Sequence, residues 1–203
     1  MAVTTFGLYA NDTLSTTAST DVGIIAQSDL SDGAHDFQFF FGSTVANTVL
    51  QTQINPGVNQ ITLTPAYILP SRLNSTAYSL GDSVVPNPVN GYRYQATTAG
   101  TSGASAPTWG TILNGTTTDG SVIWTLVAED SPVSEIKLAL TQAALASATG
   151  GASLNLGANI LSGVADAVQF WMRVTNTITQ PSDTLATPEL GVVINDVQEI
   201  STI

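Results

Sequence analysis

Short runs of alternating apolar and polar residues, separated by turn-forming pairs, are the main pattern along this chain. The clearest run covers residues 36–42, where Phe37, Phe39 and Phe41 fall on one side of an extended strand and Phe40 falls on the other. Successive side chains of a β-strand point to opposite faces, so a two-residue period is typical of a strand that packs one face on a core. Residues 36–42 are therefore predicted to form such a strand.

Further strands are predicted from the same two-residue period, over residues 45–53, 60–64, 133–140, 153–160, 168–175 and 189–200. Turns are predicted at residues 55–59 and 161–163, and one short helix over the alanine-rich residues 141–148. Many short strands with a single short helix predict an all-β fold. The expected architecture is an antiparallel β-sandwich of the immunoglobulin-like or jelly-roll-like kind.

Residues 71–130 are predicted to form a small β module inserted into this larger domain. Short β-branched runs meet there at Asn90-Gly91 and Asp119-Gly120, pairs that accept positive φ angles and favour hairpin turns. The segment also holds five of the eight Tyr and Trp residues of the chain. We expect this module to recognise or pack against another molecule and not to catalyse a reaction.

The remaining residues divide into two further parts. Residues 35–70 together with residues 131–203 are predicted to form the main sandwich. Residues 1–34 are rich in Thr, Ser, Ala and Asp and are predicted to be an extended arm or a pair of irregular strands. Two interpretations of this N-terminal part stay open: a peripheral segment of the main domain, or an arm that docks on a neighbouring subunit.

The aromatic and glycine positions of the inserted segment follow one motif: Ala-Tyr78-x-x-Gly81-Asp82-x-Val, then Gly91-x-x-Tyr94-x-Ala, then Trp124. This motif resembles small carbohydrate-binding modules of the chitin-binding type. The longer form, with Pro107-Thr-Trp109 and Asp119-Gly120-Ser-Val-x-Trp124-Thr, is similar to a cassette of tailed-bacteriophage virion proteins. The resemblance covers about a quarter of the chain. It implies a virion protein that carries a carbohydrate-binding-like module.

Two roles are open for the aromatic residues of the module. Tyr92 and Tyr94 lie two residues apart and so share one strand face, and Trp109 lies in a Pro/Gly loop; these three are the candidate sugar-binding rings. Tyr78 and Trp124 are predicted to belong to the core of the module. Polar neighbours that could reach sugar hydroxyl groups are Asn90, Gln95 and Asp119. The alternative is that a small module uses most of its aromatic rings for its own core.

The charge balance narrows the classes of partner. Fifteen acidic residues and four basic ones give a net charge of −11, and charged residues make up only 9% of the chain. Nucleic acids and anionic membranes attract clustered Lys and Arg, so neither partner is expected. The chain has no cysteine, and its first residues show neither a secretory signal nor a membrane span. We expect assembly in the host cytoplasm and release by lysis.

Candidate catalytic and metal-binding residues are few, and none is predicted to act. His35 is the only histidine and no Gly-x-Ser-x-Gly motif accompanies it, so neither a hydrolytic triad nor a zinc site is expected. Asp29, Asp32 and Asp36 cluster, but their spacing does not follow a calcium loop. Lys137 could form an isopeptide bond only if buried beside an acid, and it is predicted to face solvent. Glycosidase carboxylates are not excluded by spacing, yet most acidic residues here lie in turns. No cofactor is expected.

The sequence therefore predicts a non-enzymatic structural protein on the exterior of a tailed-bacteriophage particle, associated with the tail, baseplate or fibre and with attachment to the host surface. One alternative is a capsid decoration protein that stabilises the head. An alternative of another class is a stand-alone carbohydrate-binding adhesin. The expected partners are other virion proteins, host-surface polysaccharide and further copies of the chain in a homo-oligomer, held together by strand edges and the N-terminal arm.

Overall fold

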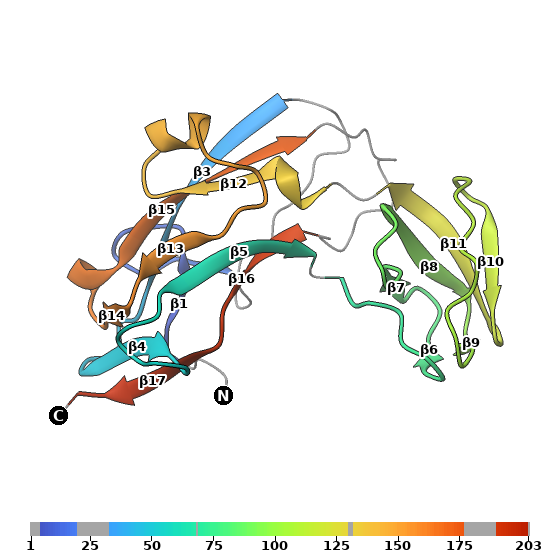
Figure 1. Cartoon of the computed structure of the whole chain (residues 1–203), viewed down its shortest axis with the longest axis horizontal. Coiled ribbons are helices and arrows are strands. Elements are labelled where there is room, and N and C mark those ends of the chain that lie inside the picture. Colours follow the sequence, from blue (N-terminus) through green and yellow to red (C-terminus); the bar gives the residue numbers. More distant parts are fainter. Residues whose placement is uncertain (1–4, 20–32, 68, 130–131, 177–189, 203) are drawn as a thin grey trace.

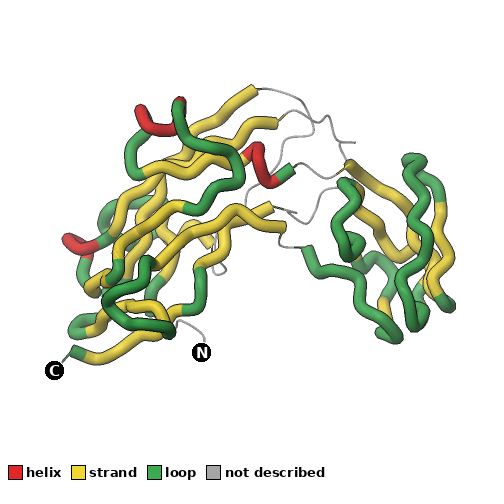
Figure 2. The backbone as a smooth tube through the Cα atoms, in the orientation of Figure 1, coloured by secondary structure: helices red, strands yellow, loops and turns green. Residues whose placement is uncertain are grey.

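A computed structural model describes residues 5–19, 33–67, 69–129, 132–176 and 190–202 of the chain. It contains two groups of β-strands, one large and one small (Figure 1). Strands and loops account for nearly all of both groups, and the helices are single short turns (Figure 2). Every strand pairing within the two groups is antiparallel. The all-β, sandwich-like fold expected from the sequence is confirmed.

The large group contains the strands β1 (Gly7–Tyr9), β2 (Thr17–Ser19), β3 (Gly33–Gly42), β4 (Thr48–Thr52), β5 (Ile61–Tyr67), β12 (Ile136–Ala139), β13 (Leu154–Gly157), β14 (Asn159–Leu161), β15 (Val168–Asn176), β16 (Leu190–Ile194) and β17 (Val197–Ser201). Its 3-10 helices are η1 (Val133–Glu135), η2 (Ala143–Ala146) and η3 (Val164–Asp166). One five-stranded sheet has the order β12-β15-β3-β1-β2. Two three-stranded sheets, β13-β5-β16 and β14-β4-β17, complete the sandwich.

One hydrophobic core joins the three sheets. Phe170 of β15, Leu63 of β5 and Leu50 of β4 each come from a different sheet, and all three side chains are fully buried. Phe39 packs its ring 5.7 Å from that of Phe170, centroid to centroid. Each fully buried side chain of this size stabilises the fold by about 1.5–3 kcal/mol relative to its exposed form. The strands predicted over residues 36–42 and 168–175 correspond to β3 and β15, which pair with each other. The predicted residues supply most of the large apolar side chains of these two strands.

Two predicted strands are each divided between sheets. The segment 153–160 forms β13 and the start of β14. Strand β13 ends at Gly157, whose positive φ of 118° turns the chain from one sheet to the other. The described part of segment 189–200 likewise forms β16 and β17. The break lies at Asn195, where the side-chain Oδ1 accepts the backbone N–H of Thr62 at 2.9 Å. The prediction of one continuous strand in each place was wrong.

The N-terminal residues that the structure describes belong to the sandwich. Strand β1 pairs with β3 and with β2, which adds both short strands to the five-stranded sheet. Phe6 and Leu8 are buried in the main core. Residues 5–19 are therefore a peripheral part of the main domain, the first of the two interpretations. The rest of the proposed arm lies outside the described residues.

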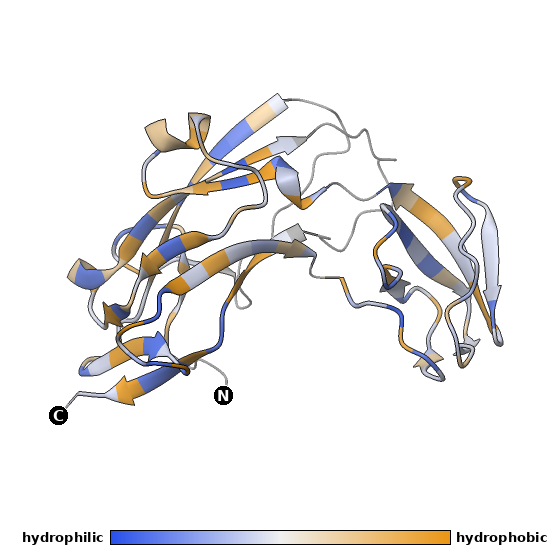
Figure 3. Cartoon of the chain, in the orientation of Figure 1, coloured by the Kyte–Doolittle hydropathy of each residue, from blue (hydrophilic) through white to orange (hydrophobic). Residues whose placement is uncertain are grey.

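The small group is the inserted module, with strands β6 (Ala77–Tyr78), β7 (Ser83–Val84), β8 (Tyr92–Thr98), β9 (Gly100–Thr101), β10 (Thr116–Asp119) and β11 (Val122–Glu129). These strands pair only with one another, in a four-stranded sheet β10-β11-β8-β7 and a two-stranded sheet β6-β9. The module has its own buried cluster, separate from the core of the sandwich. Strand β11 is apolar over most of its length (Figure 3), and every second residue from Val122 to Ala128 is buried. Val122, Trp124 and Leu126 belong to this cluster.

Candidate functional site

The aromatic rings of the module converge on Trp124. Its side chain is fully buried on β11, and the ring of Tyr78 meets it edge-on with centroids 4.8 Å apart and planes at 74°. Trp109 lies 6.1 Å from Trp124 and 4.3 Å from Tyr94. Aromatic pairs at these separations stabilise a fold by about 0.5–1.5 kcal/mol each beyond the area that they bury. The rings thus form the core that a small module needs.

Tyr94 is part of this core and is not a sugar-contacting ring. Its side chain is 0% exposed, and its hydroxyl group donates to the carbonyl of Gly110 at 2.8 Å and accepts from Nδ2 of Asn90 at 3.0 Å. The two-residue spacing from Tyr92 correctly gives a shared strand face, but this face is turned to the interior. The loop that contains Trp109 closes over it.

Tyr92 and Trp109 keep partial exposure. Both pack against the buried cluster of the module, and neither is fully covered. Of the three candidate sugar-binding rings, those of Tyr92 and Trp109 therefore keep exposed surface that a ligand could contact. The same contacts make Trp109 a structural residue, because its removal would uncover Tyr94 and Trp124.

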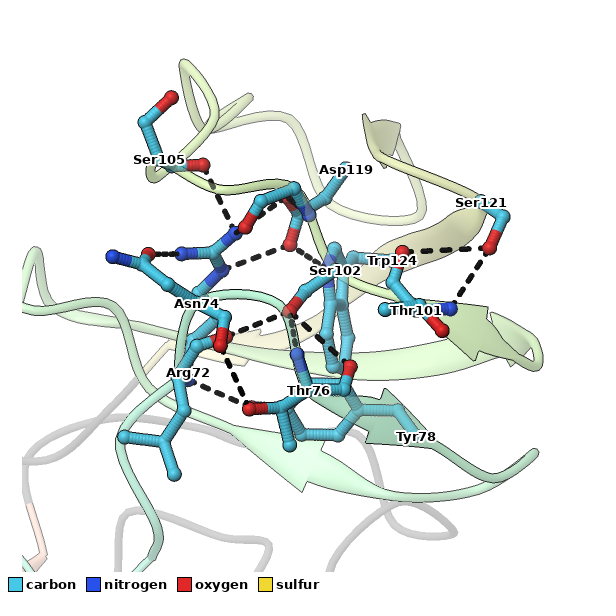
Figure 4. A network of polar contacts seen from close by, with 12 residues as sticks. Arg72, Asn74, Thr76, Tyr78, Thr101, Ser102, Ser105, Asp119, Ser121 and Trp124 are labelled. Atoms are coloured by element: carbon cyan, nitrogen blue, oxygen red, sulfur yellow. Dashed lines mark hydrogen bonds and ion pairs between the residues drawn. The ribbon is translucent and has the colours of Figure 1, made fainter.

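A buried ion pair lies beside Trp124 (Figure 4). Arg72 donates two hydrogen bonds to Asp119, from Nε to Oδ2 at 2.9 Å and from Nη2 to Oδ1 at 2.7 Å. Both side chains are only 2% exposed. The indole N–H of Trp124 donates to Asp119 Oδ2 at 3.0 Å, and the backbone N–H of Gly103 donates to Oδ1 at 2.8 Å. The carboxylate is thus fully hydrogen-bonded, as a buried charge requires.

The guanidinium group of Arg72 is satisfied in the same way. Nη2 also donates to the carbonyl groups of Gly103 and Ser105, at 2.6 and 2.9 Å, and Nη1 donates to the side chain of Asn74. Burial by itself would raise the pKa of Asp119. The hydrogen bonds from Arg72, Trp124 and Gly103, together with the charge of Arg72, hold this pKa below its ordinary value. The Asp119 carboxyl group is therefore ionised at neutral pH.

Hydrogen bonds of Ser102 hold the first residues of the module beside this network (Figure 4). Its hydroxyl group donates to the carbonyl of Leu73 at 2.7 Å and accepts the backbone N–H of Thr76 at 3.0 Å. The side chain is buried. Residues 72–76 are consequently fixed against residues 101–105 and the turn after β10.

The polar side chains expected to reach sugar hydroxyl groups are engaged inside the module. Asp119 belongs to the buried ion pair, Asn90 binds Tyr94, and Nε2 of Gln95 donates to the carbonyl of Gly81 at 3.3 Å. Sequence reasoning missed Arg72 as the partner of Asp119. A signal was available in β10, where Thr117 and Asp119 alternate with exposed residues and so share the interior face.

The module also has an open pocket of about 450 Å³, lined by Leu69, Pro70, Tyr78, Gly81, Asp82, Ser83 and Val84. Its walls are mostly apolar. Asp82 Oδ2 accepts the backbone N–H of Ser79 at 2.7 Å, which fixes the carboxylate at the rim. This pocket can accept an apolar group flanked by a hydrogen-bond donor, and sequence reasoning did not predict it because Leu69 and Pro70 precede the motif.

The remaining candidate residues lie in the sandwich. His35 is exposed on β3 opposite Val174, within the strand and not before it. The carboxylate of the neighbouring Asp36 accepts hydrogen bonds from Nε and Nη2 of Arg173, at 2.6 and 2.9 Å. These hydrogen bonds hold the pKa of Asp36 below its ordinary value. Asp29 and Asp32 lie outside the described residues. Lys137 is partly exposed on β12, directly opposite Arg173.

Among the described residues, no group of three or more His, Cys, Asp or Glu side chains is placed to hold a metal ion. Nor does that part of the chain contain a helix with the length and apolar character needed to span a membrane. Comparison of the chain with protein-family models, curated proteins and solved structures finds no match.

Proposed function

We propose that this chain is a non-enzymatic structural protein on the exterior of a tailed-bacteriophage particle, in the tail, baseplate or fibre. The observation that carries the proposal is the division of the chain into a sandwich and a module with separate cores. Such a division suits a protein in which one part is held in an assembly and the other projects from it. The motif that resembles virion cassettes, from Tyr78 to Trp124, lies in the module, the part that we propose projects.

The charge of the chain also supports an exterior position. A net charge of −11 would be repelled by packaged nucleic acid, whereas it keeps an outward surface soluble. Two of the four basic side chains, Arg72 and Arg93, are buried in the module. The acidic side chains of Asp119 and Glu135 are buried as well, so burial among the described residues leaves the net charge of the surface unchanged.

Attachment to a host polysaccharide would depend on a small set of side chains. Tyr94 and Trp124 are committed to the core, so sugar contact would fall to Trp109, Tyr92 and the open pocket beside Tyr78. For this reason structural support is the better-founded role, and sugar binding is a property to be tested separately.

Immunogold labelling of purified virions, with antibody raised against the whole chain, tests the proposal. We expect label on the tail or its tip. Label confined to the head would make the protein a capsid decoration protein, and intact particles without label would overturn the exterior-virion proposal. Antibody pre-absorbed with the purified chain is the matched control. Co-sedimentation of the chain with insoluble chitin and with host cell walls then tests the adhesin alternative directly.

A further inference from the structure

The outward face of the β14-β4-β17 sheet carries an apolar row whose two ends are exposed and whose central residue, Val49, is only 7% exposed. Ile200 of β17, Val49 of β4 and Leu161 of β14 lie directly opposite one another in the strand register and therefore share one face. Ile200 is 41% exposed and Leu161 is 51% exposed, although both lie within strands. The opposite face of the same sheet, with Leu50 and Ile160, is buried in the core.

Two more exposed aliphatic side chains lie close in sequence to these strands. Val45 precedes β4 and Val164 begins η3, and each is 47% exposed. The two segments are joined by a hydrogen bond from the N–H of Gly163 to the carbonyl of Ser43 at 2.8 Å. The next row of the sheet is neutral, with Gln198, Gln51 and Asn159 in register. Exposed apolar side chains that share one sheet face, as Ile200 and Leu161 do, are typical of an interaction site.

Strand β17 also has an open edge. It is the last strand in the order β14-β4-β17, and no described strand pairs with its other side. The N–H of Thr202 bonds to the carbonyl of Asn47 at 2.7 Å, and the N–H of Gln53 bonds to the carbonyl of Asp196 at 3.1 Å. Backbone groups alternate in direction along an antiparallel strand. Even-numbered residues of β17 thus point toward β4, and Glu199 and Ser201 present their N–H and C=O groups to the open edge.

We propose that β17 pairs antiparallel with β17 of a second copy of this chain, about a two-fold axis at Ile200. Glu199 then exchanges two backbone hydrogen bonds with Ser201 of the second copy, and the two Ile200 side chains meet as a non-hydrogen-bonded pair, the closest cross-strand arrangement. The two three-stranded sheets become one six-stranded sheet. Its outer face carries a continuous apolar row that runs from Leu161 of one copy to Leu161 of the other.

A second copy fits this surface because the two rows that would meet carry no charge. Two chains with a net charge of −11 repel each other, so they can associate only where acidic groups are absent from the contact. The one acidic side chain of the paired segment, Glu199, points to the other face of the sheet, where its carboxylate binds the backbone N–H and the hydroxyl group of Thr5. A two-fold contact needs a self-complementary surface, and an apolar row beside an open edge provides one.

The edge of β12 shows the contrast. It bears Lys137, a residue type that disfavours edge pairing, and the N–H of Gly151 covers the carbonyl of Ile136 at 2.8 Å. On β17 such a cover reaches Val197, whose carbonyl accepts a hydrogen bond from Nε2 of Gln53 at 3.0 Å. Among the described residues no strand covers the edge at Glu199 and Ser201. The proposed dimer does not depend on where the protein is located. A failure of the dimer proposal would therefore leave the virion proposal unaffected, and the reverse also holds.

Sedimentation velocity of the full chain over a range of concentrations tests this pairing. We expect a species of twice the chain mass of 21.0 kDa. Ser201→Pro removes an N–H that points to the open edge and no bond within the sheet, so it should weaken the dimer at least about tenfold while the fold is kept. Ile200→Lys should do the same by placing two like charges together. Val89→Lys, at an apolar residue of the module that is 42% exposed, is the matched control and should leave the dimer intact.

Circular dichroism establishes that each variant is folded. If the Ser201→Pro variant does not fold, the dimerisation of the Ile200→Lys variant alone tests the proposed pairing. A wild-type chain that stays monomeric at all concentrations overturns the proposal, as does a dimer that survives both substitutions. Hydrogen exchange gives a second readout: the amides of Glu199 and Ser201 should become protected as the concentration rises, and their continued rapid exchange in a dimer would place the contact elsewhere.

Discussion

The two arginine–aspartate pairs of this protein have the same chemistry and different surroundings. Arg72 and Asp119 are excluded from solvent and hydrogen-bonded throughout, whereas Arg173 and Asp36 form their pair on a partly exposed strand face. An exposed pair contributes little to stability because water already solvates both charges. A buried pair behaves differently, since loss of one partner leaves the other charged and without solvent.

Substitution of Asp119 by Asn should therefore destabilise the module strongly. The amide can still accept from Trp124 but leaves Arg72 without its counter-charge, at a cost of about 3–5 kcal/mol. Urea denaturation followed by tryptophan fluorescence measures this cost, with Trp171→Phe as background so that the signal comes only from Trp109 and Trp124. Asp36→Asn in the same background is the matched control and should leave the fluorescence transition unchanged.

The same carboxylate predicts how the stability of the module depends on pH. The pKa of Asp119 is lowered in the folded state, so its contribution is complete above the unfolded-state pKa and is lost as pH falls through the lower folded value. The urea midpoint of the module should stay constant from pH 7 to about pH 5 and fall below about pH 4. In the Asp119→Asn variant this acid-dependent loss should be absent, and a decline of equal size would assign it to other groups.

At the scale of elements, the β10–β11 hairpin positions the buried pair. Asp119 and Val122 close a two-residue turn in which Gly120 has a φ of 66°, as the first central residue of a type II′ turn requires. A Cβ atom on Gly120 would lie 2.4 Å from the carbonyl oxygen of Thr101. The turn is therefore specific for glycine both by conformation and by space.

Gly120→Ala should lower the free energy of unfolding of the module by at least about 2 kcal/mol, from the left-handed backbone and the overlap together. Gly91 provides the comparison, because its φ of 84° is also positive but no atom lies within 4 Å of the added Cβ. Gly91→Ala should cost only about 1–2 kcal/mol, the backbone term alone. Equal losses in the two variants, measured by the same fluorescence assay, would contradict the steric part of this account.

The elements that the sequence predicted well are those whose pattern is local. The two-residue period of residues 168–175 and the Asp119-Gly120 turn need no knowledge of the rest of the chain. The break at Asn195 was missed because it depends on a hydrogen bond to Thr62, far away in the sequence. The burial of Tyr94 was missed for the same reason, since the loop of Trp109 that covers it shows no periodicity.

At the scale of the whole molecule, the charge opposes association of copies. At an ionic strength of about 0.01 M the Debye length is about 30 Å, and it shortens to about 8 Å at about 0.15 M. Two chains of net charge −11 should therefore dimerise more tightly as salt is added. Sedimentation equilibrium at the two ionic strengths measures the change, and tighter association at low salt would show that opposite charges drive the contact.

The position of the module between β5 and η1 has a consequence for how such proteins diversify. Strand β5 contacts η1 directly, so the places where the chain leaves the sandwich and returns to it are adjacent (Figure 1). Recombination between genomes could exchange the intervening cassette for another domain whose ends lie close together, without disturbing a single pairing of the sandwich. A foreign domain inserted at the same junction in the laboratory should likewise leave the sandwich folded. The sandwich could then be used to display that domain.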